Sequence, residues 1–499
     1  MKRPFRGLRR EPDPHYDAVV IGAGIGGLIS ANLLARDGLR VLLAEQHYMV
    51  GGYCSTFRRA GYTFDAATHF YPLLGNPETL TGRLLQELGI QTGWVKMDPV
   101  DTFHFPDGSR FAVPADFDIY RARLAEEFPA ETAALDSFFA AVRETYGLGL
   151  LHFFRGRPVE SLSRLAPWYD LTLRQALDRW FQNPRLKLLL SADCPHWGSP
   201  PSRTSFVFDS MLRLSYFLGN YYPRGGSQAF ADALAARFEE LGGHVLTSTM
   251  ARRIRIEGGL ARGVELETLR GPRAGRHARV AAGAVISNAD LLLTLERLVG
   301  PEHLEPGALE PLRKLRPTFP CYLCHLGLEG VPDDVLEETQ GYYWDSWDMD
   351  RVGLDALRFK IFVPTLYEPA MAPPGGQVLI IQKVLEMDYE GVGDWEAHKA
   401  RVDAFVLDHL ERLIPGISRR IVVRTSATAR TSSRFTLNHQ GAMLGWEMSP
   451  DQLGEARPAM ISNIPNLHFT GHWTRPGGGI TPVIVSAQEV ARKVAGSAA

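Results

Sequence analysis

The sequence predicts an α/β fold in which a doubly wound parallel sheet is assembled from segments at both ends of the chain. Two observations predict it. Residues 17–45 have the pattern of strand, glycine-rich turn, helix and second strand, and residues 466–496 have the pattern of strand, glycine-rich turn and helix. A chain of 499 residues exceeds the usual size of one domain, so a second domain is expected.

The first turn carries glycines in the spacing GxGxxG, directly after the apolar strand 17–21. The first glycine permits a tight turn, the second lets backbone approach a diphosphate, and the last lets helix and strand pack closely. The second strand, residues 40–45, ends in Glu45, which can accept hydrogen bonds from a ribose diol. Together these features predict a dinucleotide site. Its expected residues are Gly22, Gly24, Gly26, Gly27 and Glu45.

The C-terminal segment has the same order of strand, glycine-rich turn and helix. Residues 466–471 predict a strand, the turn RPGGGITP follows, and residues 481–494 predict a helix, with Pro482 tolerated in its first turn. A helix that begins after glycines presents unpaired N–H groups and a partial positive charge. Placed at the N1–C2=O edge of a flavin, it would stabilise the negative charge of the reduced ring. The residues expected there are Gly471, Gly478, Gly479, Ile480 and Thr481.

The middle of the chain predicts a return to the nucleotide-binding sheet. A helix is expected over residues 227–241, with Ser227 as a plausible N-cap and a glycine pair at its end. Strands follow in the order 244–249, 251–257, 261–267 and 278–290.

Several of these motifs resemble the phytoene desaturase-like family, which contains bacterial carotenoid desaturases, carotenoid cis-trans isomerases and retinol saturases. They include VVIGAGIGGLISANLLARDGLRVLLAEQHYMVGGY, YPRGGSQAFADAL, EPAMAPPGGQVLIIQ and TRPGGGITPVIVSAQ. They are spread over nearly the full chain. The stretch EQH…GGYCSTF…GYTFDAATHFY is most similar to the saturase and isomerase branch, whereas TRPGGGITPVIVSAQ is most similar to the desaturase branch.

The resemblance implies an architecture and a cofactor. It implies a discontinuous Rossmann-type FAD-binding domain and a mixed-sheet and helical substrate-binding domain. The segments of the first are 1–100, 220–300 and 441–499, and those of the second are 101–219 and 301–440. It further implies that Met250 faces the adenine and that Gly51 and Gly52 lie near the pyrophosphate. Tyr53 stands where many relatives have an arginine, so the phosphate contact is expected to pass to Arg58, with Ser55, Thr56 and Arg59 as alternatives.

The resemblance also implies a reaction, in which a long apolar isoprenoid such as a carotenoid is desaturated by hydride transfer to FAD. The electron acceptor would be a quinone or oxygen. Three alternatives stay open: a saturase or cis-trans isomerase of the same family, an amine oxidase-type flavoenzyme, and a non-catalytic prenyl-binding protein of the GDP-dissociation inhibitor type. The polar candidates for catalysis are Asp65, Thr68 and His69, with His196, Trp197, His472 and Arg475 as weaker ones. His69 is either a proton acceptor or a structural histidine.

Composition narrows the remaining possibilities. A net charge of −2 argues against nucleic-acid binding, and scattered histidines offer no metal-ligand spacing. Four cysteines give no disulfide framework, and Cys321 and Cys324 are expected to be structural residues of a buried strand. The expected location is the cytoplasm, with peripheral membrane contact as an alternative. The basic residues 1–10 predict either a solvated tail or a weak anchor to anionic lipid.

One segment predicts an apolar surface. Residues 205–222 contain Phe206, Phe208, Met211, Leu212 and Phe217, which can form one wide face of a helix. This face is expected to be core or a domain interface. The alternative is a tunnel wall or a membrane-dipping helix that admits a lipid.

Overall fold

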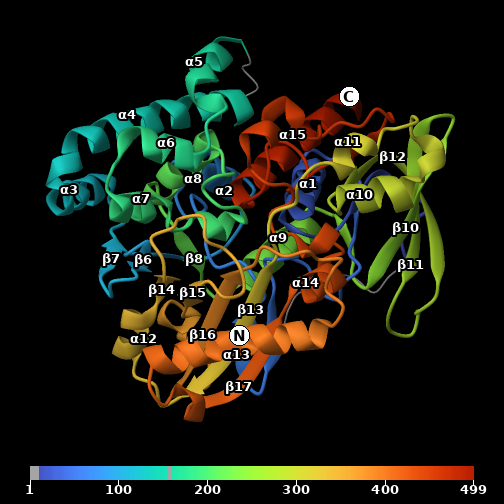
Figure 1. Ribbon diagram of the computed structural model, residues 1–499. Coiled ribbons are helices and arrows are strands. Elements are labelled where there is room, and N and C mark those ends of the chain that lie inside the picture. The colour runs from blue at the N-terminus through green and yellow to red at the C-terminus, as the bar shows by residue number, and fades with distance from the viewer. Residues whose placement is uncertain (1–10, 155–158, 499) are drawn as a thin grey trace.

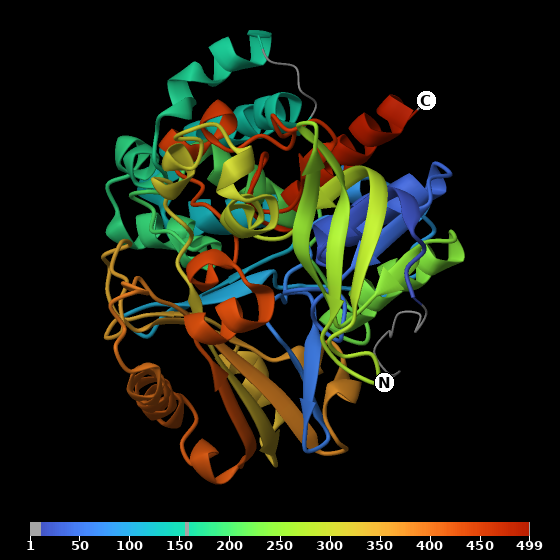
Figure 2. The same cartoon turned by 90° about the vertical axis from the view of Figure 1, so that its right-hand side faces the viewer.

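The computed structural model describes residues 11–154 and 159–498. The basic N-terminal segment, for which a tail or a lipid anchor is expected, lies outside the described residues. Two seven-stranded sheets organise the chain, and a layer of helices lies beside them (Figures 1 and 2). Within the described part of the chain, no helix is long and apolar enough to cross a membrane.

The first sheet contains the parallel strands that the sequence predicts. Its spatial order is β10-β11-β12-β1-β2-β9, and β18 pairs with the C-terminal part of β12. The pairs β18–β12, β12–β1, β1–β2 and β2–β9 are all parallel. The bounds are β1 (His15–Ile21), β2 (Val41–Ala44), β9 (His244–Leu246), β10 (Thr249–Glu257), β11 (Leu260–Thr268), β12 (His277–Ser287) and β18 (Leu467–Phe469). The predicted α/β fold with a Rossmann-type sheet is therefore confirmed.

Helices from distant parts of the chain cover one face of this sheet with a shared apolar core. The crossover helix α1 joins β1 to β2, and the last helix packs beside it, as Figure 1 shows at the top of the molecule. The bounds are α1 (Ile25–Arg36), α2 (Leu80–Glu87), α9 (Ser227–Glu240) and α15 (Ile480–Ala498). The predicted helices 227–241 and 481–494 correspond to α9 and α15.

The second sheet is mixed and has the order β17-β13-β16-β15-β14-β6-β7. The helix α13 (Trp395–Leu413) lies across one of its faces (Figures 1 and 2), with Val402, Val406 and Leu410 fully buried. The bounds are β6 (Asp101–His104), β7 (Arg110–Val113), β13 (Cys321–Glu329), β14 (Gly341–Trp344), β15 (Arg358–Phe362), β16 (Gly376–Val384) and β17 (Ile421–Ala427). Cys321 and Cys324 are buried in β13 as free thiols, as the sequence predicts.

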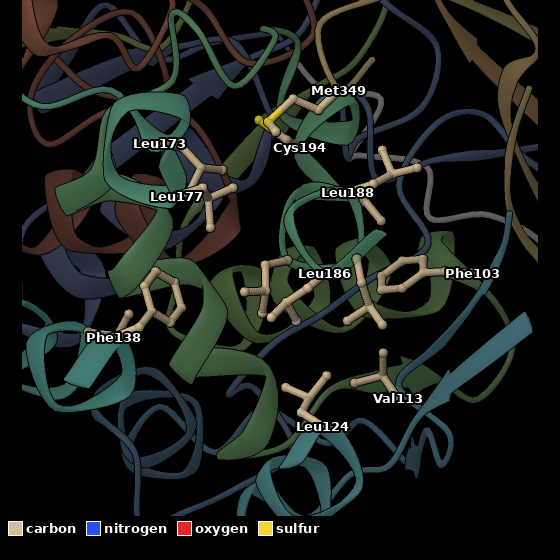
Figure 3. Close-up of a cluster of buried hydrophobic side chains, with 14 of the residues drawn as sticks. Phe103, Val113, Leu124, Phe138, Leu173, Leu177, Leu186, Leu188, Cys194 and Met349 are labelled. Atoms are coloured by element: carbon tan, nitrogen blue, oxygen red, sulfur yellow. The ribbon is translucent and has the colours of Figure 1, made fainter. Parts of the chain in front are cut away.

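The helical layer is built on its own hydrophobic core, part of which Figure 3 shows. Phe138, Leu177 and Leu186 are fully buried there. Polar caps define the helix starts: Thr172 and Gln175 form a capping box, and Asn183 caps the next helix. The bounds are α3 (Phe117–Glu127), α4 (Thr132–Gly149), α5 (Val159–Tyr169), α6 (Leu173–Trp180), α7 (Pro184–Ser191) and α8 (Phe206–Phe217).

The remaining elements are short. They are the hairpin β3 (Thr56–Arg59) and β4 (Tyr62–Asp65), the pair β5 (Trp94–Lys96) and β8 (Tyr221–Pro223), and the helices α10 (Leu291–Leu293), α11 (Glu310–Arg313), α12 (Asp333–Thr339) and α14 (Ala429–Thr436).

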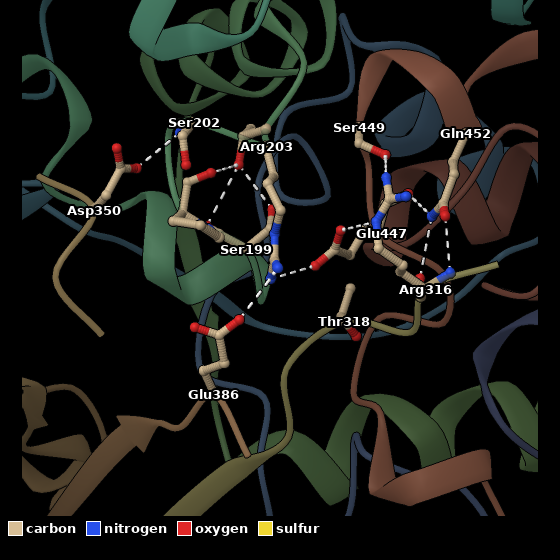
Figure 4. Close-up of polar contacts among 12 residues, drawn as sticks. Ser199, Ser202, Arg203, Arg316, Thr318, Asp350, Glu386, Glu447, Ser449 and Gln452 are labelled. Carbon is tan, nitrogen blue, oxygen red and sulfur yellow. Dashed lines mark hydrogen bonds and ion pairs between the residues drawn. The ribbon is translucent and has the colours of Figure 1, made fainter. Parts of the chain in front are cut away.

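A buried carboxylate ties the helical layer to the segment that leads into β18 (Figure 4). Glu447 is 1% exposed, and its two oxygens contact Nη2 of Arg203 at 2.8 Å and Nε of Arg316 at 3.1 Å. Arg203 precedes α8 and also contacts Glu386, which follows β16. Because removing one partner would leave a buried charge uncompensated, this network fixes the relative position of the segments that it joins.

The close packing of α1 on the first turn gives a stability prediction. A Cβ at Gly27 would lie 2.0 Å from the carbonyl oxygen of Gly22, so Gly27→Ala must displace backbone. We expect this substitution to lower the free energy of unfolding by about 1–3 kcal/mol, measured by chemical denaturation of the purified protein.

Gly147→Ala is the matched control. Gly147 lies within α4, and its Cβ would meet no heavy atom within 4 Å. Alanine is the better helix former, so this variant should gain up to about 1 kcal/mol. Equal stability of the two variants would contradict the close packing at Gly27.

Candidate functional site

The carboxyl ends of four parallel strands meet at one edge of the first sheet. β1 ends directly before Gly22, β2 directly before Glu45, β12 directly before Asn288, and β18 shortly before Gly471. Backbone hydrogen bonds of 2.8–2.9 Å join these ends, from Gly22 N to Ala44 O, from Asn288 N to Ile21 O and from Thr470 N to Ser287 O. β1 lies between β12 and β2, and the connections that follow β1 and β12 lead to strands on opposite sides of this pair. Sheets of this α/β type bind their ligands at the carboxyl ends of the strands where the strand order reverses in this way.

Glu45 is held at this edge by the backbone. Its Oε2 accepts from Ala23 N and its Oε1 accepts from His47 N, both at 2.7 Å. The side chain is 8% exposed and lines a cavity. Burial raises the pKa of Glu45, and the two backbone donors act against that rise.

The glycines of the first turn leave the start of α1 open. Gly22 has a φ of +93°, which side-chain-bearing residues rarely adopt. No side chain of residues 11–154 or 159–498 caps the N-terminus of α1, and Gly24, Ile25 and Gly26 line the cavity there. The uncapped N–H groups and the positive end of the helix therefore face a space that suits an anion.

The second glycine pair lies against the first turn. Gly51 N donates to Ala23 O at 2.7 Å, and Gly51 and Gly52 both line the cavity. Arg58 is exposed on β3 and does not line the cavity, whereas Arg59 does. Of the two arginines, Arg59 is therefore the one that faces the cavity.

The C-terminal turn completes the site from the other end of the chain. The predicted residues Gly471, Gly478, Gly479, Ile480 and Thr481 all line the cavity. Gly471 N donates to Ser486 Oγ of α15 at 3.0 Å. Thr481 Oγ1 is buried and has no hydrogen-bond partner among the residues described. The start of α15, like that of α1, thus presents polar groups to the cavity.

Asn288 joins the two ends of the chain and is a site residue that sequence reasoning missed. Its Nδ2 donates to Gly22 O at 3.3 Å, and a Cβ at either Gly26 or Gly471 would lie within 2.8 Å of its Oδ1. The pattern SNAD at the end of the predicted strand 278–290 could have indicated it, because polar residues at the carboxyl end of a parallel strand face the binding crevice.

A single cavity of about 780 Å³ runs from these strand ends into the space between the second sheet and the helical layer. The end of the cavity at these strand ends, here called its nucleotide end, is polar, and Met250 of β10 lines the cavity as well. Its far end is walled by apolar side chains of the helical layer: Tyr146, Leu150, Phe153, Phe154, Trp197, Phe208, Met211, Leu212 and Tyr216. The apolar residues predicted for the segment 205–222 therefore serve two purposes. Phe208, Met211 and Leu212 line the cavity, whereas Phe206 and Phe217 pack in the core of the helical layer.

Asp65 does not line the cavity. Its Oδ1 accepts from Ser227 N at 2.9 Å at the start of α9, and its Oδ2 accepts from the Tyr222 hydroxyl. Burial raises the pKa of Asp65 to about 6. The carboxylate that the sequence proposes for catalysis thus satisfies a helix terminus.

The other two catalytic candidates, Thr68 and His69, are neighbours in the sequence but have different surroundings. Thr68 lines the cavity, whereas His69 is not part of the lining and is 1% exposed. The His69 ring stacks on Phe362 at 4.9 Å and lies 5.6 Å from the ring of His196, which does line the cavity. Burial, together with the charge of Lys360, lowers the pKa of His69 well below its usual value. The imidazole is therefore neutral at physiological pH.

Of the weaker catalytic candidates, some line the cavity and one does not. Trp197 and His472 line the cavity. Arg475 does not, and its Nη1 instead contacts Glu455 at 2.8 Å. The second sheet contributes Gln382 and His325 to the lining, which sequence reasoning did not single out because isolated polar residues in apolar strands carry no local signal.

The residues present fit FAD. The lining offers a carboxylate for a ribose, the starts of α1 and α15 for the pyrophosphate and the flavin edge, and a volume within the range of small-molecule sites. The orphaned hydroxyl of Thr481 gives one more polar atom that a bound cofactor would satisfy. Among the described residues, no cluster suited to a metal ion is present.

Comparisons with known proteins agree with this geometry. A family model described as "Flavin containing amine oxidoreductase" matches residues 25–495. All-trans-retinol 13,14-reductase from Macaca fascicularis is 27% identical, over 91% of this chain and 82% of that protein. Prolycopene isomerase 1 from an Oncidium hybrid cultivar is 27% identical, over 97% and 84%. Phytoene desaturase (neurosporene-forming) from Cereibacter sphaeroides is 28% identical, over 95% and 94%.

Similarity to a solved structure supports the fold, and only the fold. An oxidoreductase from Methanosarcina mazei superposes with a TM-score of 0.67 at 18% identity, over 95% of this chain and 99% of that one.

The position of Glu45 predicts a defect in cofactor retention. Glu45→Ala removes the carboxylate that faces the ribose end of the cavity, so the purified variant should fold but retain less FAD, with affinity lower by about tenfold or more. Flavin absorbance per polypeptide measures this. Asp37→Ala, an exposed carboxylate at the other end of α1, is the control and should keep its flavin. Unchanged flavin content in Glu45→Ala would count against the assignment.

The buried Asp65 predicts a pH-dependent stability. Its pKa is raised on folding from 3.8 to about 6, so its favourable contribution is complete below pH 3.8 and is lost as the pH rises through 6. The unfolding free energy of the wild type relative to Asp65→Asn should therefore decline by up to about 3 kcal/mol between pH 4 and pH 7.

Denaturant unfolding at several pH values measures this difference. Asp116→Asn removes an exposed carboxylate that caps α3 and is the control, for which no such decline is expected. A difference that grows with pH would refute the role given to burial.

Proposed function

This chain belongs to the family of flavin-containing amine oxidoreductases and is an FAD-dependent oxidoreductase, and from this premise we propose that its substrate is a long apolar isoprenoid such as a carotenoid. The proposed reaction is desaturation by hydride transfer to the flavin. The chain matches the curated relatives over most of their length, and their names concern retinol, prolycopene and phytoene.

The observation that carries this proposal is the chemistry of the far end of the cavity. Its walls are aromatic and aliphatic, with Phe153, Phe208 and Met211 among them. Among the described residues, Glu45 is the one carboxylate in the cavity lining, and it lies at the nucleotide end. A cationic amine would find no countercharge near the reacting end, whereas an apolar chain gains from burial there. The lining therefore favours a hydrocarbon chain over the amine alternative.

Few protein groups are needed for such chemistry, since FAD supplies the hydride acceptor and the protein supplies orientation and electrostatics. The start of α15, at Gly479–Thr481, would stabilise negative charge at the flavin edge. The apolar walls would hold the chain against the ring and exclude water. The imidazole of His472 lines the same region, and burial, followed by the charge of Arg457, lowers its pKa to about 4. His472 is therefore neutral at physiological pH, and a pKa this low makes it a weak proton acceptor.

A second candidate is a saturase or cis-trans isomerase reaction on the same class of substrate. It is favoured by the similarity to retinol 13,14-reductase and prolycopene isomerase, whose identities differ from that of the desaturase by one percentage point. The electron acceptor of a desaturase would be a quinone or oxygen.

We also propose peripheral contact with a membrane, from which such a substrate would enter. The apolar wall of the cavity includes Leu150, Phe153 and Phe154, and Leu151 between them is 43% exposed. An apolar entrance with an exposed leucine suits the lipid–water boundary.

Anaerobic spectroscopy tests the reaction. The purified holoprotein is mixed with a defined polyene, and the flavin absorbance is followed. Bleaching of oxidised flavin by phytoene is the expected result and identifies a desaturase. Conversion of polyene only after addition of a reductant identifies a saturase or isomerase. Bleaching by amines, and by none of the polyenes, would refute the proposed substrate class.

Two substitutions in or beside α8 connect this activity to the cavity. Met211→Glu places a charge in the apolar wall and should lower polyene turnover by about tenfold or more while flavin content is kept. Leu218→Glu makes the same change at the end of α8, where the side chain is 44% exposed, and should leave turnover unchanged. Equal activity of the two variants would contradict the position proposed for the substrate.

A further inference from the structure

A buried cation lies behind the turn that leads into α15. Arg457 is 1% exposed, and it is not part of the cavity lining. The hydrogen bonds that its guanidinium donates are 2.8–3.3 Å long, and their acceptors are backbone carbonyl oxygens. These carbonyls are those of Trp446, Glu447, Gln452, His472 and Thr474. The side chain thus ties the segment 446–452 to the segment 472–474.

The second of these segments continues into the wall of the cavity. His472, Pro476 and Gly478 line the cavity. A Cβ at Gly477, between the last two, would lie 3.4 Å from Cζ of Arg457. The guanidinium therefore lies directly behind the backbone of this turn, on the side away from the cavity.

The charge of Arg457 has no acidic partner in the part of the chain that the structure describes. The carboxylate of Glu447 contacts Arg203 and Arg316 (Figure 4), and this residue offers Arg457 only its backbone carbonyl. Burial lowers the pKa of Arg457 to about 9, so the guanidinium is still charged at neutral pH. The carbonyl dipoles solvate this charge but do not neutralise it.

A buried charge without a countercharge costs free energy, whereas a neutral donor could join the same two segments. The charge itself is therefore the feature that needs an explanation. Water screens it only weakly in this position, so its field extends into the neighbouring part of the cavity. The imidazole of His472 responds to this field, because burial first, and then the charge of Arg457, lowers its pKa.

We infer that Arg457 is a positioning residue whose buried charge, acting through the backbone of residues 472–478, stabilises the reduced flavin and raises its reduction potential. A flavin that accepts a hydride gains negative charge at its N1–C2=O edge, which the turn before α15 is expected to face. The inference goes beyond the proposed function, because it concerns the cofactor and holds whichever substrate delivers the hydride.

Two substitutions separate the charge from the hydrogen bonds. Arg457→Lys keeps the charge and Arg457→Gln removes it, while both donate to fewer carbonyls than arginine does. Both variants should therefore unfold at lower denaturant concentration than the wild type. The reduction potential of the bound flavin is measured by anaerobic equilibration of the purified holoprotein with a reference dye.

In Arg457→Gln, this equilibrium should shift at least about tenfold towards oxidised flavin, which is about 30 mV for a two-electron couple. In Arg457→Lys, it should stay within about twofold of the wild type, because the charge is kept. Arg36→Gln makes the same change at the exposed end of α1 and should keep the wild-type potential. An unchanged potential in Arg457→Gln would overturn the inference. An equal shift in Arg457→Lys would do so too, since the effect would then come from the lost hydrogen bonds.

The wild type gives a second test, which does not depend on the folding of either variant. A fixed positive charge favours the anionic form of reduced flavin, so two electrons should enter with one proton. The potential should then fall by about 30 mV per pH unit between about pH 5.5 and pH 7. A fall of about 60 mV per pH unit would indicate uptake of two protons and would overturn the inference.

Discussion

The whole site depends on one geometric constraint, which is the contact between the first turn and the helix that follows it. Gly27 has no Cβ, and α1 therefore lies against the carbonyl of Gly22. This contact aims the start of α1 along the edge where β18, β12, β1 and β2 end. Glu45, Asn288 and Gly471 are then placed by the sheet itself, since each follows a strand. The packing of the backbone is thus sufficient to form a binding crevice at this edge of the sheet.

The parts of the site that lie within continuous motifs could be predicted from the sequence. The glycine turn, Glu45, the second glycine pair and the start of α15 are encoded by residues close together in the chain, and the structure brings all of them to the cavity except Gly27 and Arg58. The far end could not be predicted in this way. His196 and Gln382 are far apart in the sequence, and only the approach of the helical layer to the second sheet brings them together. Asp65 is a different case, because its predicted role in catalysis came from a motif that resembles a family, whereas its contacts come from the fold: its carboxylate accepts a hydrogen bond at the start of α9.

Electrostatics divides the cavity into two chemical environments. The nucleotide end combines Glu45 with two helix starts and suits a charged, hydrogen-bonding ligand. The far end has its charges placed behind the wall, where Lys360 pairs with Asp101 and Glu447 pairs with two arginines. These paired charges connect the helical layer and the second sheet to their neighbours without entering the apolar space. The imidazoles of His69 and His196 are neutral because burial lowers the pKa of both, and the positive charge of the buried Lys360 lowers it further.

The late position of β18 and α15 in the chain has a consequence for biosynthesis. The ribosome makes β1 and α1 before the other elements described, and α15, which packs on α1, is made after all of them. During translation, the apolar face of α1 therefore lacks Ile484, Ala487 and Val490, which cover it in the finished molecule. Such exposed surface in a nascent chain invites association with chaperones. Incorporation of the cofactor is accordingly a late event, which follows the synthesis of the elements that complete its pocket.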